Sequence, residues 1–255
     1  MKQISFILLA IFFASCGGKV AQSPMELIAH AGGNVGVHYS NSREALEKSI
    51  SEGFRYIELD LIYTADSILV AAHDWEWFNK ITGFEQKGDT APTFADFSSR
   101  RIHGKYTPLS AADINAVFEN DTTIYLVTDK ISSPALLAQN FPRLKERMVV
   151  EAFSYSDYEA LRREGYYRVM YSCMATDLSG SLVKHMLLHA LFSGPKIEWI
   201  TMYVGELNNI AFRLVDALVD FNMALFTINN YSEIPHDNLS DINKVKMIYT
   251  DKLIP

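Results

Sequence analysis

Two acidic residues and a histidine interrupt a strongly apolar segment, residues 54–74, which reads FRYIELDLIYTADSILVAAHD. Glu58 and Asp60 are two positions apart, so on a β-strand their side chains point to the same face. Two carboxylates buried together are costly unless a cation lies between them. A hairpin centred on residues 66–67 would pair position 60 with position 73, which predicts that His73 lies about 5 Å from Asp60.

These groups predict a site for a hard divalent cation with an acid/base group beside it. Carboxylate oxygens are the ligands that Mg²⁺ and Ca²⁺ prefer, and an imidazole transfers protons near neutral pH. The alternative interpretation is a buried salt-bridged cluster that only stabilises the fold.

Apolar, strand-like runs alternate with helix-like segments along the chain, which is typical of a parallel (β/α)₈ TIM barrel. If residues 68–74 are the return arm of the hairpin, eight barrel strands are predicted, at 26–31, 55–61, 123–129, 148–153, 168–173, 199–204, 224–229 and 245–250. Helices are predicted at 42–52, 111–119, 134–147, 155–163, 180–193 and 206–221. Residues 74–108 form the longest stretch predicted to be irregular.

Polar groups gather where the predicted strands end, which is where such barrels carry out their chemistry. They are His30, Glu58, Asp60, Asp129, Glu151 and Asn229. This clustering favours an enzyme over a purely structural barrel. His185 and His189 are four positions apart on a predicted helix, but their apolar neighbours indicate packing and not a metal site.

The N-terminus has the pattern of a secretory signal. Lys2 precedes an apolar run at 4–13, which is too short to span a bilayer as a helix. Ala14 and Ser15 then lead to Cys16 and resemble the lipobox of bacterial lipoproteins, which implies cleavage before Cys16 and lipidation of that residue. The alternative is an ordinary secretory signal that contains a cysteine. The predicted division of the chain is a signal peptide at 1–15, a tether at 16–24 and one barrel domain at 25–255.

Localisation and partners follow from the N-terminus and from charge. A lipidated Cys16 predicts a membrane-anchored lipoprotein of the bacterial cell envelope, held by its N-terminal lipid. The net charge is −7 and no basic stripe is present, which argues against nucleic-acid binding. An acidic protein that binds a phosphorylated substrate needs a local cation.

Six segments, in order, resemble motifs of the glycerophosphodiester phosphodiesterase family, part of the superfamily of phosphatidylinositol-specific phospholipase C barrels. IAHAGG (28–33) is similar to the family's HRG opening, NSREALEKSISEGFRYIELDL (41–61) to its ENT element and ELD strand, and TADSILVAAHD (64–74) to its element ending in HD. APTFADF (91–97), ALFTINN (224–230) and MIYTDKLIP (247–255) are similar to its PTLEE, WTVN and IxTDxP elements.

The resemblance implies a metal-dependent hydrolase of glycerophosphodiesters or related lipid head-group phosphodiesters. The family's general base and general acid correspond to His30 and His73, and its metal-binding pair corresponds to Glu58 and Asp60. The implied cofactor is a divalent cation, Mg²⁺ or Ca²⁺, and the implied partner is a small-molecule or lipid-derived phosphodiester.

The chain departs from the family pattern at two phosphate-proximal positions. The arginine of HRG is Ala31, and the glutamate of ENT is Ser40. Both changes affect phosphate and glycerol recognition more than acid/base chemistry. A different phosphodiesterase or phospholipase acting on envelope lipids or polymers, and a non-catalytic envelope binding lipoprotein, are therefore the alternative functions.

The third metal ligand is ambiguous from the sequence. The family's ExK element appears as LVTDKI (126–131), in which no single register keeps both the acid and the lysine. We favour Asp129 as the ligand because the metal needs a hard oxygen anion. Lys130 would then reach the phosphate through a bulge, and Glu151 on the next strand is the reserve ligand.

Overall fold

The computed structural model describes residues 25–173, 197–234, 237 and 239–255. The predicted signal peptide, the tether with Cys16, and the predicted helix at 180–193 with His185 and His189 lie outside the described residues. Within those that are described, no helix combines the length and apolar character that crossing a membrane requires.

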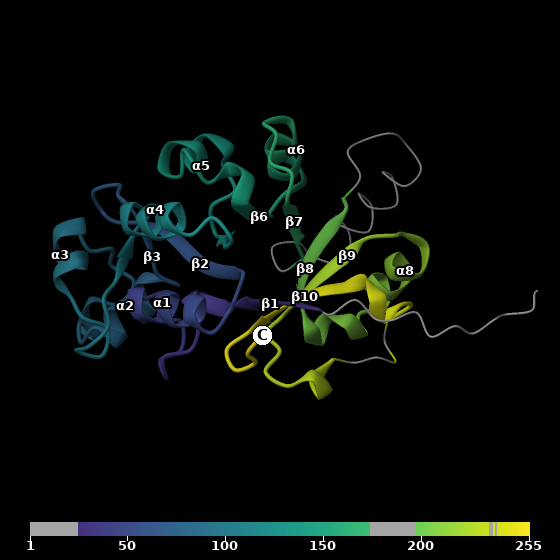
Figure 1. Cartoon of the computed structure of the whole chain (residues 1–255), viewed down its shortest axis with the longest axis horizontal. Helices are drawn as coiled ribbons and strands as arrows, with labels where there is room; N and C mark the ends of the chain where they lie inside the picture. Colours follow the sequence, from purple (N-terminus) through teal and green to yellow (C-terminus); the bar gives the residue numbers. More distant parts are fainter. Residues whose placement is uncertain (1–24, 174–196, 235–236, 238) are drawn as a thin grey trace, which may run out of the picture.

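Eight parallel strands of the described chain close into a barrel (Figure 1). They are β1 (Glu26–Ala29), β2 (Tyr56–Tyr63), β5 (Tyr125–Asp129), β6 (Met148–Ala152), β7 (Val169–Ser172), β8 (Trp199–Tyr203), β9 (Asn222–Phe226) and β10 (Val245–Thr250). Neighbours in this order pair with one another, and β1 pairs with both β10 and β2, which closes the barrel. The predicted TIM barrel is confirmed.

The two faces of these strands are both buried, which explains why the strands read as almost continuous apolar runs. Side chains at alternating positions fill the barrel interior, and the positions between them pack against the surrounding helices. The interior cluster consists of Ile28, Val127, Val149, Met170, Ala224, Met247 and Tyr249.

Helices connect the strands on the outside of the barrel. They are α1 (Arg43–Ser51), α4 (Ala111–Asn120), α5 (Pro134–Asn140), α6 (Tyr155–Arg163) and α8 (Ile210–Leu218), with 3-10 turns η3 (Lys145–Arg147), η4 (Val204–Asn208), η5 (Tyr231–Glu233) and η7 (Ile242–Lys244). Ser42, Ser110 and Ser154 cap α1, α4 and α6 with their side chains, so these helices begin where predicted.

Two predicted helices were too long. The helix predicted at 134–147 ends at Asn140, because Pro142 lacks an amide donor and its ring disfavours helical geometry in the preceding residue. The helix predicted at 206–221 is divided into η4 and α8 at Asn209, whose backbone is extended.

The hairpin after β2 is present, but its predicted register was wrong by one residue. Strand β3 (Leu69–Ala71) runs antiparallel to β2 with Leu61 opposite Ala71, and the Ala72 amide donates to the Asp60 carbonyl at 2.9 Å. A three-residue loop replaces the predicted two-residue turn, because Ser67 adopts a left-handed conformation with φ of 64°.

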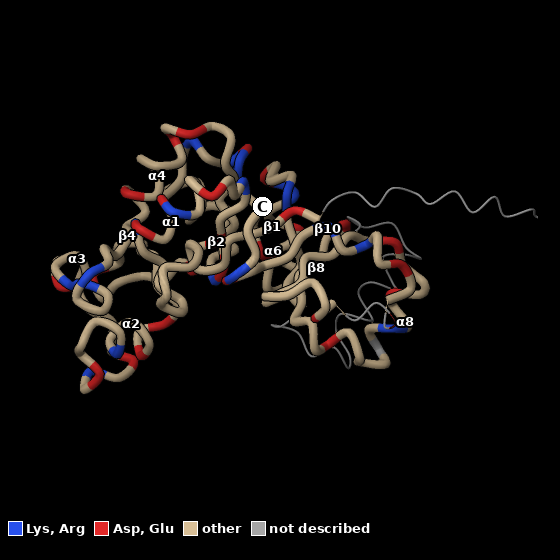
Figure 2. Tube along the Cα trace, turned by 60° about the horizontal axis from the view of Figure 1, so that its bottom comes forward, with Lys and Arg blue, Asp and Glu red and all other residues tan. Residues whose placement is uncertain are grey.

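The stretch predicted to be irregular, 74–108, contains two helices. Asp74 and Thr93 cap α2 (Trp75–Ile81) and α3 (Phe94–Ser99), with η2 (Glu85–Lys87) between them. Side chains of these helices and of Val70 on β3 form a small core of their own that is rich in aromatic rings. Strand β3 also pairs with the short antiparallel strand β4 (Leu109–Ser110). Figures 1 and 2 show α2 and α3 at the opposite end of the molecule from α8, and Figure 2 shows Lys and Arg interspersed with Asp and Glu along the described chain.

The turn that follows β1 fixes the position of His30 through close packing against α1. The chain passes through η1 (His30–Gly32) to Gly33, whose φ is 110°. The Ser49 hydroxyl on α1 donates to the Gly32 carbonyl at 2.8 Å, and a Cβ atom on Gly33 would lie 1.9 Å from the Ser49 oxygen. Only glycine fits this approach and this backbone angle without strain.

We expect Gly33→Ala to lower the free energy of unfolding by about 2–4 kcal/mol, because backbone strain adds to the steric clash. Gly36→Ala is the matched control, since Gly36 also has a positive φ, of 80°, but a Cβ there would meet nothing within 4 Å. It should cost only about 1 kcal/mol. Urea denaturation measures both, and equal losses would show that contact with Ser49 does not restrict this turn.

Candidate active site

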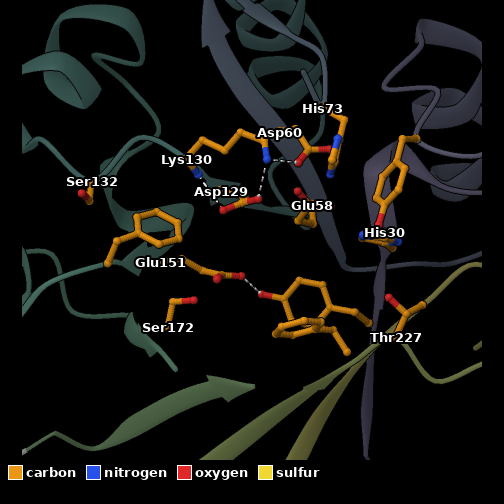
Figure 3. A pocket seen from close by; sticks show the side chains of 14 residues that line it. His30, Glu58, Asp60, His73, Asp129, Lys130, Ser132, Glu151, Ser172 and Thr227 are labelled. Carbon is orange, nitrogen blue, oxygen red and sulfur yellow. Dashed lines mark hydrogen bonds and ion pairs between the residues drawn. The ribbon is translucent and has the colours of Figure 1, made fainter. Parts of the chain in front are cut away.

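A cavity of about 640 Å³ opens at the carboxyl ends of the strands (Figure 3). Its lining residues come from most of the strands and from the loops that follow them, as expected for a barrel of this kind. They are His30, Tyr39, Glu58, Asp60, His73, Asp129, Lys130, Ser132, Glu151, Phe153, Ser172, Phe226, Thr227 and Tyr249. The pocket therefore brings together the predicted residues His30, His73, Glu58, Asp60, Asp129, Lys130 and Glu151, whereas Asn229 is not part of its lining.

Three carboxylates converge at one end of this pocket. Asp60 and Asp129 are directly opposite each other on the neighbouring strands β2 and β5, and Glu58 lies two residues before Asp60 on the same face. Each of the three can offer an oxygen such that these oxygens all lie within 4.8 Å of one another. Parallel strand register thus assembles the acidic cluster from two local sequence segments.

The hydrogen bonds of this cluster leave room for a cation. One Glu58 oxygen accepts from the Ala31 amide at 2.7 Å, whereas Oε1 is buried and has no hydrogen-bond partner. Asp60 accepts from the Asn41 side-chain amide at 2.8 Å and returns a backbone hydrogen bond to it at 3.1 Å. A buried carboxylate oxygen without a partner, in a set of hard oxygen donors, fits a divalent cation such as Mg²⁺ or Ca²⁺.

The electrostatics agree with this fit. Burial, followed by the charges of Asp60 and Asp129, raises the pKa of Glu58 well above its usual value. Burial and the Asp60 charge also raise the pKa of Asp129. Burial and the Asp129 charge raise the pKa of Glu151 to about 8. The protein by itself therefore does not compensate the negative charge that these carboxylates carry when they are all ionised.

Lys130 reaches the cluster because the backbone turns sharply after β5. Its φ is 66°, and its amide donates to an Asp129 carboxylate oxygen at 2.7 Å. This left-handed turn directs the Lys130 amine back into the pocket, 3.4 Å from Asp60 and 3.5 Å from Asp129. Burial disfavours the ammonium, but the two carboxylates outweigh that effect and raise the pKa of Lys130.

Each pocket histidine is oriented by a carboxylate through its Nδ1 atom. His30 Nδ1 lies 2.9 Å from Asp251, and His73 Nδ1 hydrogen-bonds to Asp74. Burial alone would raise the pKa of both aspartates, but hydrogen bonds and the neighbouring histidines lower it, so the aspartates remain ionised. This arrangement leaves Nε2 of each ring to exchange protons.

Glu151 is adjacent to the three-carboxylate cluster and is not part of it. It lies on the neighbouring strand β6, where the buried Tyr249 hydroxyl donates to it. Figure 3 shows this contact below Asp129, with Glu58 between Asp129 and the two histidines in that view. The geometry therefore favours Asp129 as the third carboxylate beside Glu58 and Asp60, as expected from the sequence.

Sequence reasoning assigned no role to five residues of the site. Asp251 contacts His30, and its backbone amide donates to the Asn229 side chain at 2.8 Å. The other four are Asp74, Asn41, Tyr39 and Tyr249. The position of Asp251 directly after a strand was the one signal that could have found it.

Comparison with known proteins identifies the family. The sequence profile of the glycerophosphoryl diester phosphodiesterase family matches residues 30–163. The chain belongs to this family. It is therefore a phosphodiesterase, and its matched segment contains both histidines and the acidic cluster. No curated protein sequence matches significantly.

Solved structures of this family share the fold. A putative glycerophosphoryl diester phosphodiesterase from Agrobacterium tumefaciens is 16% identical, with a TM-score of 0.64 over 90% of this chain and 94% of that one. A glycerophosphodiester phosphodiesterase from Thermotoga maritima is 16% identical, with a TM-score of 0.61 over 90% and 96%. A phosphodiesterase from Oleispira antarctica, in complex with the product sn-glycerol-3-phosphate, is 14% identical, with a TM-score of 0.64 over 89% and 92%.

The raised pKa of Glu151 predicts a pH-dependent stability in chelator. A carboxyl group whose pKa is higher in the folded state stabilises the fold below its unfolded value of 4.5, and this stabilisation is lost as the pH rises towards about 8. We expect the free energy of unfolding to fall between pH 5 and pH 8, and Glu151→Gln, which keeps an acceptor for Tyr249, to reduce that fall.

Denaturation in EDTA at each pH measures the effect. Added Ca²⁺ or Mg²⁺ should stabilise the protein more at pH 8 than at pH 5, because metal binding requires ionised ligands. A stability that is flat with pH in EDTA, in the wild type and the variant alike, would contradict the assigned burial of Glu151.

Proposed function

We propose that the chain is a divalent-cation-dependent hydrolase of glycerophosphodiesters that uses His30 and His73 as its acid/base pair. The observation that carries this proposal is the arrangement of two carboxylate-oriented imidazoles beside a cluster of three carboxylates in one pocket. The two imidazoles can transfer protons, and the three carboxylates can hold a cation that neutralises phosphate charge. Phosphodiester hydrolysis requires both functions.

The two histidines divide the proton transfers. One imidazole, neutral at Nε2, takes the proton from the attacking oxygen. The other, protonated, donates to the leaving oxygen as the bond to phosphorus breaks. Asp251 and Asp74 hold Nδ1 of His30 and His73, which keeps Nε2 of each ring directed towards the substrate.

Glu58, Asp60 and Asp129 would hold the cation. When bound, it supplies positive charge that polarises the phosphate. Lys130 adds a second positive charge next to Asp60 and Asp129, and its left-handed backbone keeps the amine in the pocket. Glu151, on the strand next to Asp129, accepts a hydrogen bond from Tyr249.

The substrate class rests on the family and on a structural relative. The Oleispira antarctica phosphodiesterase holds sn-glycerol-3-phosphate as product, which supports a glycerophosphodiester as substrate here. A phosphodiester with a different leaving group is the second candidate. The observation that favours it is Ala31, which stands where the family motif has an arginine and which is buried outside the pocket lining.

A panel of phosphodiesters tests the function. Glycerophosphodiesters, lysophospholipids and envelope-polymer phosphodiesters are assayed after chelation, with and without added Mg²⁺ or Ca²⁺. We expect turnover of at least one diester that disappears in chelator and returns with the cation. Turnover that persists in chelator would exclude the proposed cation, and a wild type inactive on every diester would contradict hydrolysis.

Variants of the histidines test the mechanism on whichever diester is turned over. His30→Asn and His73→Asn should each lower kcat by about 10²–10⁴-fold, because each removes one proton transfer. His103→Asn is the matched control, since His103 is exposed and lies outside the pocket. Full activity in either pocket variant would remove that histidine from the mechanism.

We also propose that the mature protein is anchored to a membrane of the bacterial cell envelope through a lipidated Cys16. The support is the apolar run followed by small residues and a cysteine at the N-terminus. Cys16→Ser should release the protein from the membrane fraction, while Cys173→Ser, at a buried thiol, should not. An unmodified N-terminal peptide in mass spectrometry of the wild type would contradict the anchor.

A further inference from the structure

Tyr39 lies between the two histidines, although no sequence motif assigned it a role. Its ring centroid is 4.0 Å from that of His73 and 5.0 Å from that of His30. The side chain is half-buried and lines the same pocket as the acidic cluster. Any phosphate that both imidazoles reach must therefore also approach this phenol.

The backbone around Tyr39 is held in a specific conformation. Tyr39 and Asn41 both have left-handed angles, with φ of 49° and 47°. Asn41 is completely buried, its side chain exchanges two hydrogen bonds with Asp60, and its amide donates to the Ala31 carbonyl at 3.0 Å. Unfavourable backbone angles persist only where surrounding contacts enforce them, and they concentrate at functional sites.

The Tyr39 ring has a further aromatic contact. The His38 ring lies 3.9 Å from it, centroid to centroid, with the two ring planes tilted by 53°, and the Trp77 indole donates to the His38 carbonyl at 3.0 Å. Tyr39 therefore contacts the rings of His30, His38 and His73. A ring held by several neighbours can present its hydroxyl with little loss of conformational freedom on binding.

The pocket is short of groups that bind phosphate. Among the described residues that line it, Lys130 is the only lysine or arginine, and its amine already lies within 3.5 Å of both Asp60 and Asp129. A phosphodiester carries a negative charge and meets several carboxylates here. Neutral hydrogen-bond donors are consequently needed in addition to a cation.

The Tyr39 hydroxyl is available as such a donor. Tyr39 lines the pocket between the two histidines, and burial together with the nearby carboxylates of Asp60, Asp251 and Glu58 raises the pKa of its hydroxyl, so the hydroxyl keeps its proton. No hydrogen bond to this hydroxyl is formed by any residue that the structure describes.

We propose that the Tyr39 hydroxyl donates a hydrogen bond to a non-bridging phosphate oxygen of the substrate, between His30 and His73. This inference rests on the proposed function, because it assumes that the pocket takes a phosphodiester. Ala31 stands where the family motif has an arginine, and its side chain cannot bind phosphate. Tyr39, in the loop before α1, then makes a phosphate contact in its place.

Tyr39→Phe tests the proposal because it removes the hydroxyl and keeps the ring with its aromatic contacts. Binding of inorganic phosphate to the full mature chain in Mg²⁺ buffer, measured by calorimetry, should weaken by about tenfold or more, since hydrogen bonds to charged groups are among the stronger ones. On any diester that the wild type hydrolyses, kcat/KM should fall by about 10- to 100-fold with an unchanged pH profile. Tyr167→Phe, at an exposed tyrosine, is the matched control and should change neither value.

Several outcomes would overturn the proposal. Phosphate binding equal to wild type in Tyr39→Phe would remove the hydroxyl from phosphate recognition. A shifted pH profile with unchanged phosphate binding would show that Tyr39 acts through the histidines. A Tyr39→Ala variant as active as wild type would show that the ring only fills space.

Two further measurements keep the result interpretable. If Tyr39→Phe fails to fold, nitration of Tyr39 in the wild type by tetranitromethane replaces it, with mass spectrometry of the peptide as readout. Bound phosphate should protect Tyr39, and equal nitration with and without phosphate would contradict the contact. A wild type that binds phosphate in a Tyr39-dependent manner but hydrolyses no diester would refute the proposed function and leave the phosphate contact supported.

Discussion

The mutual repulsion of carboxylates buried at the mouth of the barrel is the constraint on which the rest of the site depends. Glu58, Asp60 and Asp129 lie close together, with Glu151 on the next strand, and burial raises the pKa of Glu58, Asp129 and Glu151. Such a cluster persists only when donors and cations offset it. The left-handed residues Ala31, Asn41 and Lys130 each bring a donor or a positive charge to these carboxylates.

The loop between β1 and α1 supplies the neutral donors. Its Ala31 amide hydrogen-bonds to Glu58, and its Asn41 side chain hydrogen-bonds to Asp60. Both residues adopt left-handed backbone angles that cost stability in isolation. The strained loop conformation therefore directs amide donors to Glu58 and Asp60. We infer that it also directs the Tyr39 hydroxyl to the substrate phosphate. The close packing of Gly33 on α1 provides the rigid base that this geometry needs.

On the other side of the pocket, the turn after β5 supplies a positively charged side chain, that of Lys130. A regular continuation of the strand would carry Lys130 to the opposite face from Asp129. The left-handed conformation of Lys130 instead brings its amine back to Asp60 and Asp129. Asp129 and Lys130 thus both reach the pocket although they are adjacent in the sequence.

The sequence alone determined the barrel, because strand alternation, apolar runs and serine caps are local properties that each segment carries by itself. It also determined the pairing of Glu58 with Asp60, since a spacing of two fixes a common face on any strand. Only the tertiary structure decided the hairpin register, which a left-handed Ser67 shifted by one residue. It likewise decided that Asp251 orients His30, a contact between residues 221 positions apart that exists only because β1 pairs with β10 when the barrel closes.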